Sequence, residues 1–270
     1  MDSSVIAAFI LVSLAQIGIP FLIGLWVRKR FGVPWRAFWL GALFFVLVQI
    51  VHTPLVLLTQ PGLASLLVVS FGELTAIIAL GIYLGLLAGV FEEPGRYIVF
   101  KRAFPRFRLK LDKKSALMFG IGWGGIESLL VGIVLLLTMF SYVSAVPLTE
   151  QDLQDMNSQY YGGILTEEQL GMMAQQNQAL LGLTPLDILP SLAERLMAIM
   201  FHIGLTMMVF SSVVSGRKML LWLAVGIHAL LDFLVVASLP FYGVWATEGV
   251  LAVFALGAYM YSRKVWLRKE

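Results

Sequence analysis

The chain contains no cysteine and little charge. The absence of cysteine excludes disulfides, thiolate metal sites and a cysteine nucleophile, so histidine, carboxylate and hydroxyl groups must carry any chemistry. Only 13% of the 270 residues are charged and 59% are hydrophobic, whereas about 25% of an ordinary soluble domain is charged. Too few polar residues remain to cover a water-soluble globule. These deficits predict an integral membrane protein whose main solvent is the lipid bilayer.

Apolar stretches of about 20 residues, separated by charged or Pro/Gly-rich breaks, predict an all-α, polytopic transmembrane bundle of about seven spans. We expect residues 1–270 to form a single integral membrane domain. The first apolar stretch does not resemble a cleavable signal, because its basic residues follow it instead of preceding it. The predicted spans are 5–27, 38–59, 63–91, 115–140, 188–212, 219–239 and 249–265.

The basic residues indicate which way the bundle is inserted. With seven spans, all of the 19 Lys and Arg residues except Arg195 fall on one side. The positive-inside rule makes that side cytoplasmic, so the N-terminus is expected outside and the C-terminus in the cytoplasm. The basic segment 96–114 is interpreted as an anchor near anionic lipid. We expect the bilayer, and no nucleic acid, as its partner.

The loop 141–187 is the one sizeable soluble segment predicted, and it holds six acidic residues and no basic ones. Thr149 and Thr166 stand where helix N-caps are expected, so the sequence predicts two short surface helices in an outer acidic loop. The second helix is expected to lay its apolar residues on the membrane surface. A connecting role is favoured over a lid or a docking site. Those apolar residues are Leu170, Met173, Leu180 and Leu181.

Ionisable side chains inside the spans are the unusual feature of the sequence. A charged residue near a helix centre costs about 2.5–3.5 kcal/mol on insertion scales, so such residues are paired or have a function. All three histidines lie in predicted spans. The ionisable residues are His52, Glu73, Glu92, Glu93, Glu127, Glu194, Arg195, His202, His228 and Asp232.

Glycine stripes predict which carboxylates face a neighbouring helix. At about 100° per residue, Glu92 lies about 20° from a stripe of glycines at every fourth position from 81 to 89. Glu93 lies about 120° away and falls off that stripe. Glu127 lies about 20° from a second stripe that begins at Gly120. Glu92 and Glu127 are therefore expected to point into the bundle.

Helical spacing and depth predict several pairs. Arg96 follows Glu92 by one turn and can pair with it if the helix continues past Pro94. His202 and His228 lie at matched depth, about 14–15 Å below the inner surface, so they can meet.

Other residues form expected pairs of their own. Asp232 follows His228 by one turn, within hydrogen-bond reach, and Arg195 shares a face with His202. Glu73 and Arg195 both lie nearer the outer side and are expected to form a structural ion pair.

Carboxylates and imidazoles together indicate two kinds of chemistry. They can deprotonate a water and donate hydrogen bonds to an oxyanion, or they can bind a divalent metal with an open position for water. The sequence has no HExxH motif. Ser128 or Thr206 could supply a hydroxyl nucleophile, but neither lies in a nucleophile elbow. His52 is assigned a structural hydrogen bond, with Gln49 one turn away.

Four segments resemble motifs of the YhfC family of bacterial membrane proteins, regarded as intramembrane proteases and distantly similar to the CAAX prenyl protease and bacteriocin-processing group. The run FEEPGRY at 91–97 resembles the FEExxRY element, and residues 120–127 resemble the second element. The third element resembles Glu194-Arg195 together with His202. The fourth element resembles His228 together with Asp232.

This resemblance implies glutamate-dependent peptide hydrolysis inside the membrane. Glu92 would activate water together with His202, while His228 and Asp232 would match the pair that stabilises the oxyanion. The second-line candidates are Glu93, Arg96, Glu127, Glu194 and Arg195.

Two departures from the family patterns limit these assignments. Trp123 stands where the YhfC pattern usually has His, which removes a third imidazole for a metal. Asp232 replaces an Asn of the CAAX pattern. Because an ionised Asp cannot donate a hydrogen bond, we expect Asp232 to orient His228 or to stay protonated in its apolar setting.

The sequence therefore predicts an intramembrane peptide hydrolase of the bacterial plasma membrane that acts on a membrane-associated protein or peptide. A glutamic-type mechanism without a cofactor is favoured. Two alternatives stay open. One is a metal-dependent protease with His202 and His228 as ligands of a divalent ion such as zinc. The other is a non-catalytic membrane binding protein or a proton-coupled transporter.

Overall fold

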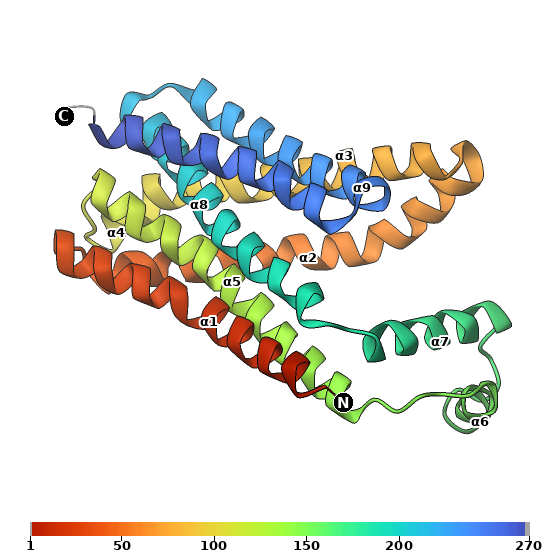
Figure 1. Cartoon of the computed structure of the whole chain (residues 1–270). Coiled ribbons are helices and arrows are strands. Elements are labelled where there is room, and N and C mark those ends of the chain that lie inside the picture. The colour runs from red at the N-terminus through yellow and green to blue at the C-terminus, as the bar shows by residue number, and fades with distance from the viewer. Residues whose placement is uncertain (1, 268–270) are drawn as a thin grey trace. The chain divides into compact units, whose positions relative to one another are not determined.

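The computed structural model describes residues 2–267, and this part of the chain consists of helices joined by short connections (Figure 1). The all-α prediction is confirmed. Apolar helices are the structures that satisfy every backbone hydrogen bond internally in lipid. The predicted C-terminal basic residues Arg268 and Lys269 lie outside the described residues. The elements are α1 (Ser3–Phe31), α2 (Trp35–Phe71), α3 (Glu73–Ile98), η1 (Val99–Ala103), α4 (Phe104–Arg106), α5 (Lys113–Ser144), α6 (Glu150–Tyr160), α7 (Glu167–Leu181), α8 (Pro185–Ser215) and α9 (Lys218–Leu267).

Six helical segments between residues 2 and 267 are long and apolar enough to cross a membrane. One of them, α9, has 50 residues, which is about 75 Å of helix against a hydrocarbon core of about 30 Å. Its helical backbone is broken at Gly243 (φ 72°, ψ −179°), where Figure 1 shows the chain turning back. The predicted spans 219–239 and 249–265 lie on either side of this break. The seven-span count and the sidedness of the termini stay predictions.

The break predicted between the second and third spans is misplaced. The sequence suggested a break at 60–62, but α2 continues through Pro61 to Phe71. The chain turns at Gly72, whose φ of 82° is a conformation that glycine adopts without steric cost. Pro61 lies inside the helix, as proline can in membrane-spanning helices when other groups satisfy the freed backbone carbonyl.

The described chain divides into two compact units. Of the described residues, those up to Ala15 and Val131–Leu192 form one unit, and Gln16–Leu130 and those from Ala193 onward form the other. The single integral membrane domain stays a prediction.

In the first unit, α6 and α7 confirm the two helices predicted in the acidic loop. Each begins with a capping box. The Thr149 hydroxyl accepts a hydrogen bond from the Asp152 backbone amide (3.2 Å) while the Asp152 carboxylate accepts one from the Thr149 amide (2.8 Å). The Thr149 hydroxyl also donates to the Asp152 carboxylate (2.6 Å), and this bond, together with that from the Thr149 amide, lowers the pKa of the Asp152 carboxyl. Thr166 and Gln169 repeat the arrangement at the start of α7.

One of the apolar residues predicted to lie on the membrane surface, Leu170 of α7, is buried in protein, while the placement of the other three on the membrane stays a prediction. Leu170 is buried, as is Leu153 of α6, and the two helices pack together. Leu180 packs against a cluster that contains Phe9 and Tyr142. The prediction for Leu170 is wrong because an apolar face has the same sequence pattern whether lipid or another helix covers it.

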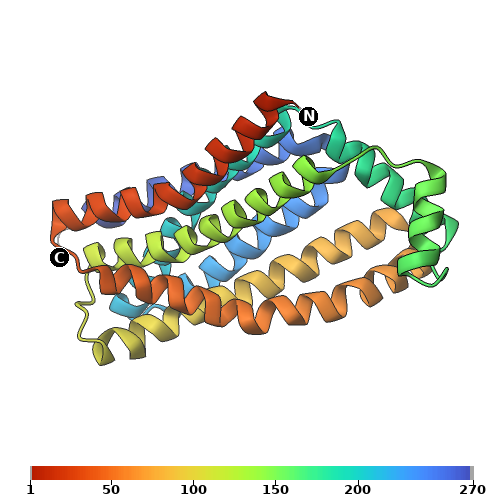
Figure 2. The ribbon, with the colours of Figure 1, turned by 90° about the horizontal axis from the view of Figure 1, so that it is seen from below.

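In the second unit, α3 packs against α2 on one side and against α9 on another (Figure 2). The predicted glycine stripe of α3 lies against α9. A Cβ atom on Gly85 would collide with the carbonyl oxygen of Ala229, and one on Gly89 would lie 2.6 Å from that of Val225. The missing side chains thus let the two backbones touch.

The glycines of α5 serve two other neighbours. On Gly120 and Gly124 an added Cβ would lie 3.1 Å from Thr206 and His202 of α8. On Gly122 it would collide with the Phe38 carbonyl oxygen of α2. The second predicted stripe is confirmed, and it brings α5 close to the helix that carries His202.

The contact of α3 with α9 can be tested by Gly85→Ala. We expect this change to lower the free energy of unfolding by about 1–3 kcal/mol, because the methyl group forces two backbones apart. The measurement is the thermal unfolding midpoint of the purified protein in detergent. Gly226→Ala is the matched control, since an added Cβ at Gly226 of α9 meets no atom within 4 Å. Equal midpoints for the two variants would contradict the close packing.

Candidate functional site

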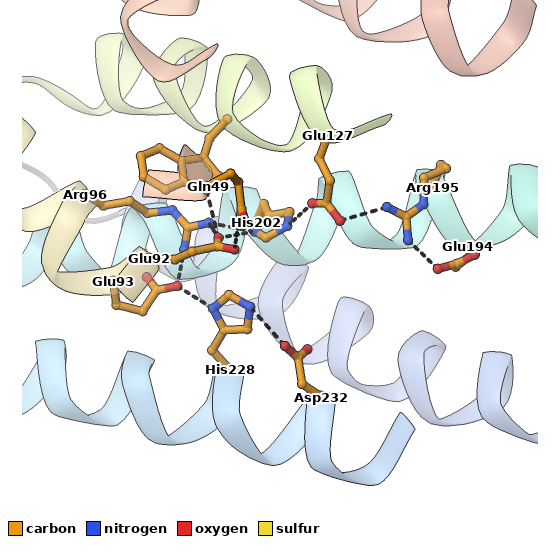
Figure 3. A network of polar contacts seen from close by, with 11 residues as sticks. Gln49, Glu92, Glu93, Arg96, Glu127, Glu194, Arg195, His202, His228 and Asp232 are labelled. Carbon is orange, nitrogen blue, oxygen red and sulfur yellow. Dashed lines mark hydrogen bonds and ion pairs between the residues drawn. The ribbon is translucent and has the colours of Figure 1, made fainter. Parts of the chain in front are cut away.

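A network of polar side chains connects α2, α3, α5, α8 and α9 inside the second unit (Figure 3). It brings together every residue that the sequence predicted as catalytic or second-line. Gln49 and Trp123 join them, although the sequence assigned no role in the site to either. The members are Gln49, Glu92, Glu93, Arg96, Trp123, Glu127, Glu194, Arg195, His202, His228 and Asp232.

Arg96 occupies the centre of the network and is fully buried. The helix α3 continues past Pro94, so Arg96 lies one turn after Glu92, as predicted. Its Nη2 donates to Glu92 Oε2 (3.0 Å) and to His202 Nδ1 (2.7 Å), and its Nη1 donates to Glu93 Oε1. The guanidinium thus compensates the charges of two buried carboxylates.

Glu92 is held by donors from three helices. Besides Arg96, Trp123 Nε1 donates to Glu92 Oε2 (2.9 Å) and Gln49 Nε2 donates to Oε1 (3.2 Å). The Arg96 guanidinium also lies over the Trp123 ring, 4.5 Å from its centroid. Trp123 therefore supplies a hydrogen-bond donor and a cation-binding face at the position where a histidine was expected.

Glu93 points into the bundle, contrary to the estimate that placed it off the packed face of α3. It is fully buried, and its Oε1 accepts a hydrogen bond from His228 Nδ1 (2.8 Å). Its Oε2 is buried without a hydrogen-bond partner in residues 2–267. The estimate failed because α3 has neighbours on more than one side, so two consecutive positions both face protein.

His228 and Asp232 are adjacent but are not hydrogen-bonded. Nε2 of His228 lies 3.8 Å from Asp232 Oδ2, which is ion-pair range and beyond a hydrogen bond. The Asp232 side chain is 36% exposed, so it borders the network. The predicted meeting of His202 with His228 is confirmed, since their ring centroids lie 5.7 Å apart.

His202 lies between two charged groups. Its Nε2 is 2.6 Å from Glu127 Oε2, and its Nδ1 faces Arg96. Arg195 Nη1 donates to Glu127 Oε1 (2.8 Å), and Arg195 Nη2 donates to Glu194. The predicted ion pair of Glu73 with Arg195 is wrong. Arg195 lies two turns before His202 on α8 and finds the carboxylate that also binds this histidine.

The remaining predicted hydrogen-bonding residues do not join the site chemistry. His52 Nδ1 contacts Gln49 Oε1 at 3.1 Å, as expected for a structural role. Ser128 donates to the Gln16 carbonyl oxygen (2.9 Å), and the Thr206 hydroxyl has no partner in the described part of the chain. Neither hydroxyl is thus hydrogen-bonded to a histidine between residues 2 and 267.

Three side chains could hold a metal ion. Glu92, Glu93 and His228 are buried, and one ligand atom of each lies within 4.8 Å of the others. Two carboxylates and an imidazole are a donor set that suits zinc and similar divalent ions. The unpartnered Glu93 Oε2 is a free donor atom in this group. His202, which the sequence proposed as a ligand, is not part of the group, because both of its nitrogens face protein side chains.

The comparison with known families covers the whole of this network. The family described as "YhfC intramembrane metalloprotease" matches residues 15–255. The chain belongs to the YhfC family. A relative from Bacillus subtilis (strain 168), "Uncharacterized membrane protein YhfC", is 29% identical over 227 residues, which are 79% of this chain and 77% of the relative. No solved structure matches the chain.

Membership of the YhfC family confirms the resemblance found in the four motifs. The chain is an integral membrane protein, and its Bacillus relative is a bacterial membrane protein. The family description supports a peptidase and makes a metal plausible. It does not support the preference for a glutamic-type mechanism over a metal-dependent one.

The central role of Arg96 predicts a large effect of Arg96→Met. We expect a loss of about 3–5 kcal/mol in the free energy of unfolding, because two carboxylates stay buried without a countercharge. The unfolding midpoint in detergent measures this loss. Adding Glu93→Gln to the Met variant removes one of the two charges and should restore part of the midpoint. If the double variant is no more stable than the single one, charge compensation is not the role of Arg96.

Proposed function

We propose that this YhfC protein hydrolyses a peptide bond of a membrane protein or membrane-associated peptide, with the bond reaching the polar network inside the bilayer. The observation that carries the proposal is the grouping of Glu92, Glu93 and His228, buried among apolar helices. Carboxylates and imidazoles are the groups that move protons to and from water during hydrolysis. The family description points to the same reaction class.

Glu92 is the general base in this proposal. Its side chain is 7% exposed, whereas that of Glu93 is fully buried, so a water molecule reaches Glu92 first. Arg96 and Trp123 bind Oε2, and Oε1 carries only the longer bond from Gln49. Oε1 takes a proton from water as the water oxygen bonds to the substrate carbonyl carbon. The proton then passes to the leaving amine nitrogen as the C–N bond breaks.

His228 stabilises the oxyanion of the tetrahedral intermediate in this proposal. Glu93 accepts a hydrogen bond from His228 Nδ1 and so fixes the orientation of the ring. The Nε2 atom of His228 then points away from Glu93. A protonated Nε2 donates to the developing oxyanion. The carboxylate of Asp232, 3.8 Å from Nε2, offsets the positive charge of that imidazolium.

A second, metal-dependent version of the proposal places a divalent cation such as zinc in the same group of residues, with Glu92 and His228 as ligands in place of the roles given above. Glu92, Glu93 and His228 would hold it, since they are the buried donors that lie close together. A bound ion would lower the pKa of a water molecule and polarise the substrate carbonyl. Arg96 and Trp123 would still orient Glu92 through the contacts described above.

Glu92→Gln tests the proposal. We expect cleavage to fall by about 100-fold or more, because the amide cannot take a proton from water. The purified protein is incubated in detergent with a set of synthetic transmembrane peptides, and products are identified by mass spectrometry. Glu73→Gln, at the exposed start of the same helix, is the matched control and should keep full activity. Undiminished cleavage by the Glu92 variant would overturn the assignment.

Removal of metal tests the metal-dependent version of the proposal. We expect a chelator such as 1,10-phenanthroline to abolish cleavage and added zinc to restore it, because the donor set fits this ion. Elemental analysis of the untreated protein should find about one ion per chain. Full activity after thorough chelation, with no bound metal, would instead support the glutamic-type mechanism predicted from the sequence.

A further inference from the structure

The proposed reaction assigns no role to the part of the network that contains Glu127 and Arg195. Glu127 and Arg195 do not belong to the group of Glu92, Glu93 and His228, yet they form a continuous chain of contacts that ends on His202. Arg195 is buried at 9% exposure, and each carboxylate oxygen of Glu127 accepts a hydrogen bond. Charged groups in such a place need a reason, since each is costly to bury.

The chemistry of its partners decides the protonation of His202. A guanidinium has five N–H donors and no acceptor, so the Nδ1 atom that faces Arg96 must be the unprotonated nitrogen. The carboxylate of Glu127 is an acceptor, so the Nε2 atom that faces it must carry the proton. His202 is therefore a neutral Nε2–H imidazole with both nitrogens in use.

The same logic gives His228 the opposite form. Its Nδ1 faces the Glu93 carboxylate and must be the protonated nitrogen. Its Nε2 is the nitrogen that remains for a substrate or a metal. The two imidazoles of one site thus differ in the nitrogen that a carboxylate holds protonated, which is Nε2 in His202 and Nδ1 in His228.

We infer that Glu127 and Arg195 are positioning residues that hold His202 as the Nε2–H tautomer, so that its Nδ1 accepts a hydrogen bond from Arg96. In this arrangement His202 neither takes a proton from water nor binds a metal. It orients Arg96, which in turn orients Glu92 and Glu93. Arg195 acts one step further away, since it fixes the Glu127 carboxylate toward the ring. The catalytic importance of this chain rests on the proposed function, whereas the tautomer does not.

The tautomer can be read directly by nitrogen NMR. The protein has three histidines, so labelling with 15N-histidine gives a spectrum that His52→Gln and His228→Gln suffice to assign. We expect the His202 signals of one protonated Nε2 and one unprotonated Nδ1 in the full-length protein in detergent. An Nδ1–H tautomer or a doubly protonated ring would overturn the inference.

Variants of Glu127 and Arg195 test whether these residues fix the His202 ring. Glu127→Ala should speed exchange of the Nε2 proton with water by about 10-fold or more, as expected for loss of a charge-assisted hydrogen bond. Arg195→Ala should change exchange in the same direction. Glu194→Gln is the matched control, because Glu194 contacts the same guanidinium but not His202, and it should leave the exchange rate unchanged. Unchanged exchange in Glu127→Ala would overturn the role of Glu127.

A conservative variant and a spectrum recorded without substrate let the tautomer be tested separately from catalysis. Glu127→Gln retains an acceptor oxygen and should keep the Nε2–H tautomer, so it replaces the alanine variant if that variant does not fold. The spectrum is recorded without a substrate. A failed cleavage assay therefore contradicts the proposed function alone, while a wrong tautomer contradicts this inference alone.

Discussion

The structure of the site depends on one buried guanidinium. Arg96 contacts Glu92, Glu93, His202 and the face of Trp123 at the same time. Two consecutive carboxylates inside an apolar bundle would otherwise repel each other and lose their hydration without compensation. Because arginine presents a planar fork of donors, one side chain can serve several acceptors in fixed directions. The positions of both glutamates and of His202 follow from that fork.

A second guanidinium repeats this arrangement at the other end of His202. Arg195 binds Glu127 and Glu194 as Arg96 binds Glu92 and Glu93. The histidine joins the two groups through its two nitrogens. His228 is attached at one nitrogen only, and its other nitrogen faces the partly exposed Asp232. This asymmetry favours His228 over His202 as the imidazole that meets a substrate or a metal.

The glycines explain why these side chains can meet. Because Gly85 and Gly89 of α3 have no side chains, the backbone of α3 touches that of α9, and His228 of α9 reaches Glu93. The bare face of α5 brings Glu127 to His202 of α8 in the same way. The side chains of Glu and His on neighbouring helices come within hydrogen-bond distance because glycines let the helices approach this closely. Packing and site geometry are thus set by the same residues.

The sequence by itself determined the all-helical membrane class, the two capped helices of the acidic loop, the pair of Glu92 with Arg96, and the identity of the ionisable residues in the site. These properties depend on composition and on positions within one helix, where the 3.6-residue repeat determines which side chains lie on the same face.

Only the tertiary structure decided that Glu93 binds His228, that Arg195 binds Glu127 and not Glu73, that Leu170 is buried, and that α2 ends at Phe71. Glu93 and His228 are 135 positions apart in sequence. Their meeting depends on which helices are neighbours, and no pattern within one helix encodes that choice of neighbour.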